Sequence, residues 1–359
     1  MSPSTQRGRR GAGALGEGPR GTAGRAASPP GLTVAVTGPT GTFGSGLIPL
    51  LQADDRIARI IGIARRPFDP AARGWTKMEY RQGDVRDPAA LEEAFRGADV
   101  VVHLAFLITG GATRETIRSI NVDGTLNVFR AAAAAGAARF VYASSVAAYG
   151  FHADNPERIP EDWPVRPAAR LFYAQEKAEL EHLLTAEAAT APDLALYLLR
   201  PPVVLGPNAL GAKDVLPAPF TELGRRLFGR PRRLPVPIPL LAPEIPIQFI
   251  HEDDVGRALQ LCVVAAGPPG AYNIAGSGIV TVADVVREFG GVPVRIPGGP
   301  VQAAARAMAR FPLLPPAAEW VEAFTRPALM DTRKARDELG WEPAYSGLEA
   351  IRATVREAG

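Results

Sequence analysis

Short apolar runs alternate with longer amphipathic stretches along most of the chain, beginning at Leu32. The apolar runs are rich in β-branched residues and predict strands at 32–37, 57–64, 78–83, 100–105, 140–144 and 195–200. A helical period predicts helices at 44–52, 88–96, 117–135 and 172–189, the first of them locally irregular at Pro49. Strands that alternate with helices are typical of an α/β fold with a doubly wound parallel sheet, which is the fold class that we expect.

The two ends of the chain depart from this pattern. Residues 1–30 are rich in Gly, Ala, Arg, Ser and Pro, and we predict a disordered tail, although a transit peptide or a wrongly assigned start codon would also explain them. Residues 31–207 form the predicted main domain. Residues 208–359 begin with an irregular Pro-rich stretch to 248, and then carry short strands at 247–250 and 272–274 and helices at 282–289 and 331–340. They predict a smaller C-terminal lobe that interleaves with the main domain.

The composition narrows the class of protein. Hydrophobic residues make up 47% and charged residues 21%, and no apolar run approaches the roughly 18–20 residues that span a bilayer. The net charge is +3, but residues 1–30 hold five arginines and one glutamate, so the rest of the chain carries a net charge of −1. That part therefore lacks the excess of positive charge that is typical of nucleic-acid-binding proteins. The single cysteine, Cys262, excludes an intramolecular disulfide, and the four histidines lack metal-ligand spacing. We therefore expect a cytoplasmic protein with no metal and with no nucleic-acid or membrane partner.

A glycine-rich turn joins the first predicted strand to the first predicted helix. It reads Thr37-Gly38-Pro39-Thr40-Gly41-Thr42-Phe43-Gly44. In such a turn, Gly38 permits the tight bend, Gly41 lets a cofactor pyrophosphate approach the backbone, and Gly44 lets helix and strand pack closely. The turn therefore predicts a dinucleotide site at the start of the helix.

The spacing G-x-x-G-x-x-G resembles that of the short-chain dehydrogenase/reductase superfamily, in particular its extended branch, the NAD-dependent epimerase/dehydratase family. The resemblance covers roughly residues 32–350. It implies a Rossmann-type, doubly wound parallel sheet with an NAD(P)-binding domain at 31–207 and a substrate-binding lobe at 208–359. It also implies a homodimer, which members of the family commonly form.

Tyr173 and Lys177 lie four residues apart on the predicted helix 172–189, which places both side chains on one face. The resemblance identifies Tyr173 as the general acid/base and Lys177 as the residue that lowers its pKa and holds the nicotinamide ribose. A free phenol has a pKa of about 10, and a nearby ammonium stabilises the phenolate. The resemblance also makes Ser145 the hydroxyl that orients the substrate oxygen, whereas Ser144 is interpreted as a strand-end turn serine.

Further positions match the family one by one. The resemblance implies that Asp84 contacts the adenine, that Leu104 and Ala105 pass beneath the cofactor, and that the loop from Pro201 closes over the nicotinamide. The predicted cofactor-binding residues are Gly38, Thr40, Gly41, Thr42, Phe43, Gly44, Arg65, Asp84, Val85, Leu104, Ala105, Asn121, Tyr173, Lys177, Pro201 and Val203. The motif His251-Glu252-Asp253-Asp254-Val255 resembles one at the lobe junction and is interpreted as structural.

Departures from the family pattern refine the function. Arg65 and Arg66 follow the second strand, where NAD-preferring members carry an acid, and this favours NADP over NAD unless both are solvated loop charges. Val146 and Ala147 stand where sugar-nucleotide 4,6-dehydratases carry an Asp-Glu pair, so that form of dehydration is not expected. Val203 stands where sugar-nucleotide epimerases carry an asparagine. The segment around it resembles reductases and hydroxysteroid dehydrogenases, and the apolar stretch 234–247 fits a non-sugar pocket or simple packing.

These features predict an NAD(P)-dependent oxidoreductase that transfers a hydride between the nicotinamide and a small or apolar alcohol or ketone. A nucleotide-sugar epimerase with bound NAD is the alternative. A non-catalytic NAD(P)-binding sensor is the alternative from another class, and the complete set of Tyr173, Lys177 and Ser145 argues against it. The expected partners are a small-molecule substrate and a second copy of the chain.

Overall fold

The structure is a computed structural model that describes residues 31–108, 112–209, 239–288, 291–297, 299 and 326–357. Gly31–Gly359 make up one compact unit, to which all of these residues belong. The predicted tail at 1–30 and most of the Pro-rich stretch at 208–248 lie outside the described residues.

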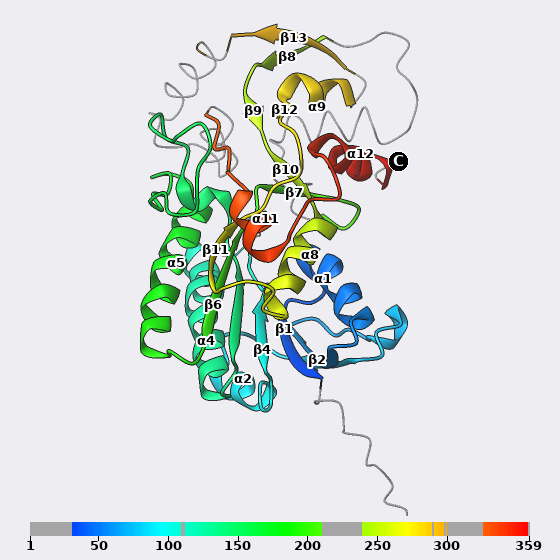
Figure 1. The fold of residues 1–359 in the computed structure, drawn as a ribbon, viewed down its shortest axis with the longest axis vertical. Coiled ribbons are helices and arrows are strands. Elements are labelled where there is room, and N and C mark those ends of the chain that lie inside the picture. Colours follow the sequence, from blue (N-terminus) through cyan, green and yellow to red (C-terminus); the bar gives the residue numbers. More distant parts are fainter. Residues whose placement is uncertain are drawn as a thin grey trace, which may run out of the picture. The chain divides into compact units, whose positions relative to one another are not determined.

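Seven parallel strands form the central sheet, in the order β11-β6-β5-β4-β1-β2-β3 (Figure 1). Their bounds are Leu32–Thr37 for β1, Ile57–Ala64 for β2, Met78–Gln82 for β3, Val100–His103 for β4, Arg139–Ala143 for β5, Ala195–Arg200 for β6 and Gly270–Asn273 for β11. The chain winds outward in one direction from β1 and in the other from β4. This reversal leaves a crevice at the carboxyl ends of β1 and β4 and confirms the predicted Rossmann-type fold.

Most strand bounds follow the sequence prediction closely. The strands β1, β2 and β6 have the predicted ends, whereas β5 begins and ends one residue early. The strand β4 ends at His103 instead of at residue 105, because Leu104 is the last residue whose N–H reaches the β1 carbonyls before the chain turns away. The edge strands β3 and β11 are also displaced, by one or two residues, from the predicted 78–83 and 272–274.

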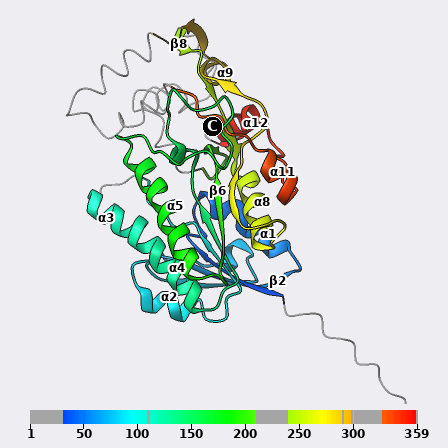
Figure 2. The same ribbon diagram turned by 60° about the vertical axis from the view of Figure 1, so that its left-hand side comes forward.

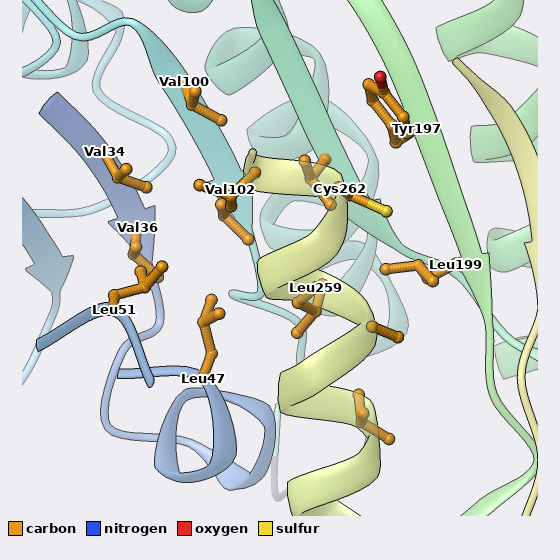
Figure 3. Packing of buried hydrophobic residues seen from close by; sticks show 14 of the residues in the cluster. Val34, Val36, Leu47, Leu51, Val100, Val102, Tyr197, Leu199, Leu259 and Cys262 are labelled. Atoms are coloured by element: carbon orange, nitrogen blue, oxygen red, sulfur yellow. The ribbon is translucent and has the colours of Figure 1, made fainter. Parts of the chain in front are cut away.

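Helices cover both faces of the sheet (Figure 2). The helices α1 (Thr42–Ala53) and α8 (Glu252–Val263) pack on one face, and α2 (Pro88–Ala94), α4 (Gly124–Ala134) and α5 (Phe172–Thr190) pack on the other. Figure 3 shows Val36 and Val102 of the sheet near Leu47 of α1 and Leu259 of α8. The alternate strand residue Val101 faces the opposite layer, as the two-residue period of a strand requires.

The helices α1 and α8 approach each other at glycines. A Cβ added to Gly256 of α8 would lie 2.3 Å from the carbonyl oxygen of Gly46 in α1, so only glycine allows this contact. Pro49 lies inside α1, as the sequence predicted, and the structure places it on the exposed side of the helix. The helix begins at Thr42, two residues before the predicted start, so the glycine-rich turn supplies its first turn.

The predicted helix at 117–135 is present, but it begins earlier, at Arg114, and contains a π-helical turn that was not predicted. The structure has α3 (Arg114–Arg118), one π-helical turn at Ser119–Asp123, and then α4, with helical backbone throughout. The wide turn contains Asn121, whose side chain is held by residues outside this segment. Such a turn inside an α-helix often lies at a functional site, and the local hydrophobic period does not encode it.

The C-terminal part of the chain adds small elements above the sheet. The strand β7 (Val203–Leu205) pairs with β10 (Phe249–His251), β9 (Pro246–Ile247) pairs with β12 (Val280–Thr281), and β8 (Pro239–Pro243) pairs with β13 (Val292–Ile296). The remaining helices are α9 (Val282–Glu288), α11 (Arg333–Leu339) and α12 (Gly347–Glu357).

The structure tests two sequence predictions for the C-terminal part, a strand at 247–250 and a helix at 331–340. The predicted strand 247–250 is divided at Gln248, whose side-chain amide pairs with the main chain of Met330. The helix predicted at 331–340 ends, as expected, at Gly340, which has a left-handed φ of 65°. Within the described ranges, no helix has both the length and the apolar character needed to cross a membrane.

Candidate active site

A cavity of about 590 Å³ opens at the carboxyl ends of the central strands. Many residues predicted from the sequence line it together, namely Gly38, Thr40, Gly41, Thr42, Phe43, Arg65, Val85, Leu104, Ala105, Ser145, Tyr173, Lys177, Pro201 and Val203. Gly44, Asp84 and Asn121 do not line it. The structure thus brings most of the predicted site together around one space.

The glycine-rich turn shapes one end of the cavity. Gly38 has a left-handed φ of 70°, and a Cβ there would lie 2.9 Å from the Ala105 nitrogen. Gly44 was expected to let helix and strand pack closely, but its close contact lies within the turn: a Cβ there would lie 2.1 Å from the Pro39 carbonyl oxygen. At Gly41, a Cβ would meet only the Gly38 carbonyl oxygen, at 3.5 Å, which leaves this backbone open toward the cavity.

The start of α1 fits a phosphate group. Gly41 is the N-cap residue and offers no side chain to the first N–H groups of the helix. Those N–H groups and the helix dipole attract an anion. The open backbone at Gly41 and the uncapped helix start together match the pyrophosphate of a dinucleotide.

Arg65 and Arg66 lie exposed at the rim, beside the end of β2. Their main chain is fixed, since Gln82 donates to the Arg65 carbonyl at 3.0 Å and Tyr80 donates to the Arg66 carbonyl. Neither guanidinium forms an ion pair with any residue in the described ranges. Asp84, predicted to contact an adenine, is paired with Arg86 at 2.7 Å in the protein alone, and hydrogen bonding to Arg86 holds the pKa of Asp84 below its usual value.

Ser145 and Tyr173 both line the cavity and lie within hydrogen-bonding distance of each other. Ser145 directly follows β5, and its Oγ accepts from the Ala147 N–H at 3.1 Å. Burial raises the pKa of Tyr173 to about 12, although its hydrogen bond with Ser145 lowers it. The phenol therefore holds its proton near neutral pH.

Lys177 is anchored beside this pair. Its Nζ donates to the Tyr142 hydroxyl at 3.0 Å and to the Ala143 carbonyl at 2.7 Å. Burial lowers the pKa of Lys177 to about 7, although the nearby Glu176 and Glu181 raise it. The expected lowering of the Tyr173 pKa by Lys177 is not seen in the protein alone, because burial dominates at Tyr173 and Lys177 itself is only partly charged near neutrality.

His103, at the end of β4, supports the floor of the site. One ring nitrogen is 2.6 Å from the Thr37 hydroxyl and the other is 2.8 Å from the Thr125 hydroxyl. Burial, followed by the charge of Lys177, lowers the pKa of His103 to about 3. The imidazole is therefore neutral and acts as a fixed hydrogen-bonding group.

Asn121 lies behind the cavity wall. Its amide donates to the Leu107 carbonyl at 2.9 Å and accepts from the Leu107 N–H at 2.8 Å, which fixes the loop after β4. The same amide donates to the buried Glu176 carboxylate at 2.8 Å. Glu176 was not predicted as a site residue, and its place beside Lys177 was the only signal for it in the sequence.

A hydrogen-bonded pair of buried charges supports the site from below. Arg200, at the end of β6, donates to Glu181 of α5, and both side chains are about 5% exposed or less. Glu181 also accepts from Ser144 at 2.5 Å. Ser144 thus has the structural role expected of it, next to the Ser145 that faces Tyr173.

The part of the cavity beyond Tyr173 is mostly apolar. Its lining includes Phe106, Leu107, Val146, Ala147, Phe151, Ile245, Ile247, Pro327 and Ala328. Of the polar side chains there, Gln248 is already paired with Met330, and Arg326 supplies a positive charge. The sequence indicated part of 234–247 as a pocket lining, and Phe106 directly follows the predicted Ala105. The sequence carried no signal for Phe151 or Arg326, because distant segments bring them to the cavity.

The described side chains do not suggest a metal centre. Among them, no three His, Cys, Asp or Glu residues gather as a metal ion would require.

Comparison with known proteins places this geometry in context. A family model described as the NAD-dependent epimerase/dehydratase family matches residues 34–275. An uncharacterized protein of Mycobacterium tuberculosis is 27% identical over 333 residues, which cover 91% of this chain and 84% of that protein. Sterol demethylase protein B of Methylococcus capsulatus is 32% identical over 179 residues, 49% of this chain and 52% of that protein. The crystal structure of UDP-glucose 4-epimerase from Thermotoga maritima, with UDP-glucose, has a TM-score of 0.68 and 21% identity, and the alignment covers 91% of this chain and 98% of that one.

Proposed function

Because the chain belongs to the NAD-dependent epimerase/dehydratase family, we propose that it is an NAD(P)-dependent oxidoreductase of the extended short-chain dehydrogenase/reductase type. The proposed reaction transfers a hydride between the nicotinamide and a small or apolar alcohol or ketone. The hydrogen bond between Tyr173 and Ser145, which both line a largely apolar cavity, is the observation on which the proposal rests.

In this proposal, Tyr173 and Ser145 both act on the substrate oxygen. The nicotinamide, when bound, supplies or accepts the hydride at its C4 atom. During reduction of a ketone, the Tyr173 hydroxyl gives its proton to the oxygen while the Ser145 hydroxyl donates a hydrogen bond to the same atom. A Tyr173 pKa raised to about 12 suits this direction, because the phenol enters the reaction protonated.

Lys177 would hold the nicotinamide ribose. Two of its three N–H donors are used by Tyr142 and Ala143, and the ammonium also lies over the ring of Phe106. One N–H donor of Lys177 therefore remains for the ribose hydroxyl groups. Charge on Lys177 would stabilise a tyrosinate formed at Tyr173.

An apolar substrate is supported by the lining beyond Tyr173. Phe106, Phe151 and Ile247 offer contact area, and Val203 offers no hydrogen-bond donor to a sugar or a diphosphate. Burial of apolar surface would supply most of the binding energy for such a ligand. The name of the Methylococcus relative, a sterol demethylase protein, points to the same class of compound.

The proposed cofactor preference is NADP. Arg65 and Arg66 lie at the rim where the adenosine ribose would sit, and their guanidinium groups are available to a 2′-phosphate. The family description names NAD, which is therefore the alternative cofactor.

Arg326 supports a second candidate function. It places a positive charge in the otherwise apolar end of the cavity, where a nucleotide diphosphate could pair with it. A nucleotide-sugar epimerase that keeps NAD bound would use such a contact, and one similar structure holds UDP-glucose.

One experiment separates these functions. The purified protein is first assayed for co-purified nicotinamide cofactor and then titrated with NADPH and NADH by fluorescence. An empty protein that binds NADPH more tightly, and that oxidises it with apolar ketones, supports the reductase. Retained NAD with interconversion of nucleotide sugars, and no net change in cofactor oxidation state, would establish the epimerase instead.

A further inference from the structure

The motif His251-Glu252-Asp253-Asp254 joins β10 to α8, and its acids have different roles. Asp254 accepts from the main-chain N–H groups of Ala344 and Tyr345, at 2.7 and 3.1 Å, and so fixes the C-terminal segment. His251 stacks on the Tyr345 ring, with centroids 4.0 Å apart. These contacts fit the structural role expected from the sequence, but they leave Glu252 unexplained.

Glu252 is a buried carboxyl group, and only one of its two oxygens has hydrogen-bond partners among the described residues. The residue is 1% exposed. Its Oε1 accepts from both the main-chain N–H and the side-chain amide of Asn208, each at 3.0 Å. Its Oε2 is buried without a hydrogen-bond partner among the described residues. A buried carboxyl group is costly, and burial raises the pKa of Glu252, so packing alone does not account for an acid here.

The neighbouring backbone closes tightly around Glu252. A Cβ on Gly206 would lie 2.7 Å from the Glu252 Cδ, and one on Gly46 would lie 2.3 Å from its carbonyl oxygen. Gly206 has a φ of 146°, which favours glycine. The contact between Gly46 and Gly256 holds α8 against α1, so Glu252 is fixed relative to the first turn of α1.

Asn208, which binds Glu252, also contacts a residue that lines the cavity. Its carbonyl oxygen accepts from the Thr42 hydroxyl at 3.2 Å. Thr42 is the first residue of α1 and lines the cavity. Asn208 also follows β7, whose residue Val203 lines the cavity farther along. One carboxylate therefore joins the turn after β7 to the glycine-rich turn before α1.

We propose that Glu252 is a positioning residue that, through Asn208, holds Thr42 and the start of α1 in place for the cofactor pyrophosphate. The inference rests on the proposed function only in assuming that a dinucleotide binds in this cavity. It assigns to the buried acid of the junction motif a role in cofactor affinity, and none in the chemical step.

The test measures binding of NADPH, NADH and ADP-ribose to Glu252→Ala, Glu252→Gln, Thr42→Val and the double variant Glu252→Ala with Thr42→Val. We expect Glu252→Ala to weaken dinucleotide binding about tenfold, the scale of about one net hydrogen bond lost between the start of α1 and the cofactor. Glu252→Gln keeps one acceptor oxygen for Asn208 and should bind nearly as the unmodified protein does. The double variant should bind no more weakly than Glu252→Ala, because the Thr42 contact is already lost.

Controls separate this role from a general loss of structure. Asp253 lies on the same turn, with its side chain 54% exposed, and Asp253→Ala should leave dinucleotide binding unchanged. If Glu252→Ala does not fold, Asn208→Ala, at an exposed turn residue, should still weaken binding severalfold. Unchanged affinity in folded Glu252→Ala or Asn208→Ala, or full additivity of Glu252→Ala with Thr42→Val, would overturn the proposal. If the unmodified protein binds no dinucleotide, it is the proposed function that fails.

Discussion

The ammonium group of Lys177 lies 3.6 Å from the centroid of the Phe106 ring. The ring faces the cation on the cavity side, and Phe106 also packs edge-on against Tyr173, with centroids 5.7 Å apart. One aromatic side chain thus borders both members of the predicted catalytic pair. This enclosure desolvates Lys177, which is why its pKa falls to about 7 although a ring face favours a cation.

Lys177 should make stability increase with pH above neutrality. Its pKa is about 7 in the folded protein and 10.5 in a free lysine, so between these values the unfolded chain binds more protons. The folded state therefore gains stability as pH rises through this range and loses it as pH falls. Each unit of difference is worth about 1.4 kcal/mol, which predicts a gain of a few kcal/mol between about pH 7 and pH 10. Urea unfolding across this range should reveal the rise, and Lys177→Met should lack it. An equal rise in the variant would contradict the assignment.

His103 should make the protein sensitive to acid. Burial depresses its pKa from 6.5 to about 3, so its contribution to stability is complete above pH 6.5 and is lost as pH falls toward 3. The expected loss is on the order of a few kcal/mol. His103→Asn should show a shallower decline of the unfolding free energy in this range. The exposed His182 supplies the control, since His182→Asn should keep the original profile.

Tyr173→Phe should abolish turnover without loss of cofactor binding. Removal of the hydroxyl deletes the proposed proton donor, and general acid catalysis is typically worth about 10²–10⁴-fold in rate. Ser145→Ala should reduce kcat by roughly 10²-fold, because it removes one donor to the substrate oxygen. Steady-state kinetics and fluorescence titration are measured on the same preparations. Turnover by Tyr173→Phe at the original rate would exclude Tyr173 as the acid.

Arg65→Ala should weaken binding of NADPH and spare that of NADH. A hydrogen-bonded contact with a 2′-phosphate predicts a loss of about tenfold or more for NADPH alone. Arg59 lies at the other end of the same strand, paired with Glu79, and Arg59→Ala serves as the matched control. An equal loss of affinity for NADPH and NADH would show that Arg65 does not bind the 2′-phosphate.

The buried pair of Arg200 and Glu181 should matter far more for stability than an exposed pair does. Arg200→Met leaves the Glu181 carboxylate buried without its cation, which predicts a loss of about 3–5 kcal/mol in the free energy of unfolding. Arg130 and Glu187 form a comparable pair at the surface, and Arg130→Ala should cost about 1 kcal/mol or less. Equal effects of the two substitutions in urea unfolding would show that burial does not govern the pair.

The sequence predicted those parts of the fold that depend on local pattern. The apolar run at 32–37 and the glycines after it sufficed for β1 and the turn, and the spacing of Tyr173 and Lys177 sufficed for their common face. Features set by contacts between distant segments were not predictable in this way. The π-helical turn around Asn121 depends on Leu107 and Glu176, and Arg326 reaches the cavity from a segment near the end of the chain. The pKa values of Tyr173 and Lys177 depend on burial, which no local pattern reports.

The position of α8 has a consequence for how this protein is made. The helix comes from the second half of the chain, yet it covers the same sheet face as α1, and β11 completes the sheet edge only after it. A nascent chain that ends near residue 207 would leave Val102, Leu199 and neighbouring apolar side chains in water. The Rossmann sheet should therefore reach its native packing only when about residue 273 has left the ribosome, and until then this apolar face stays exposed to water.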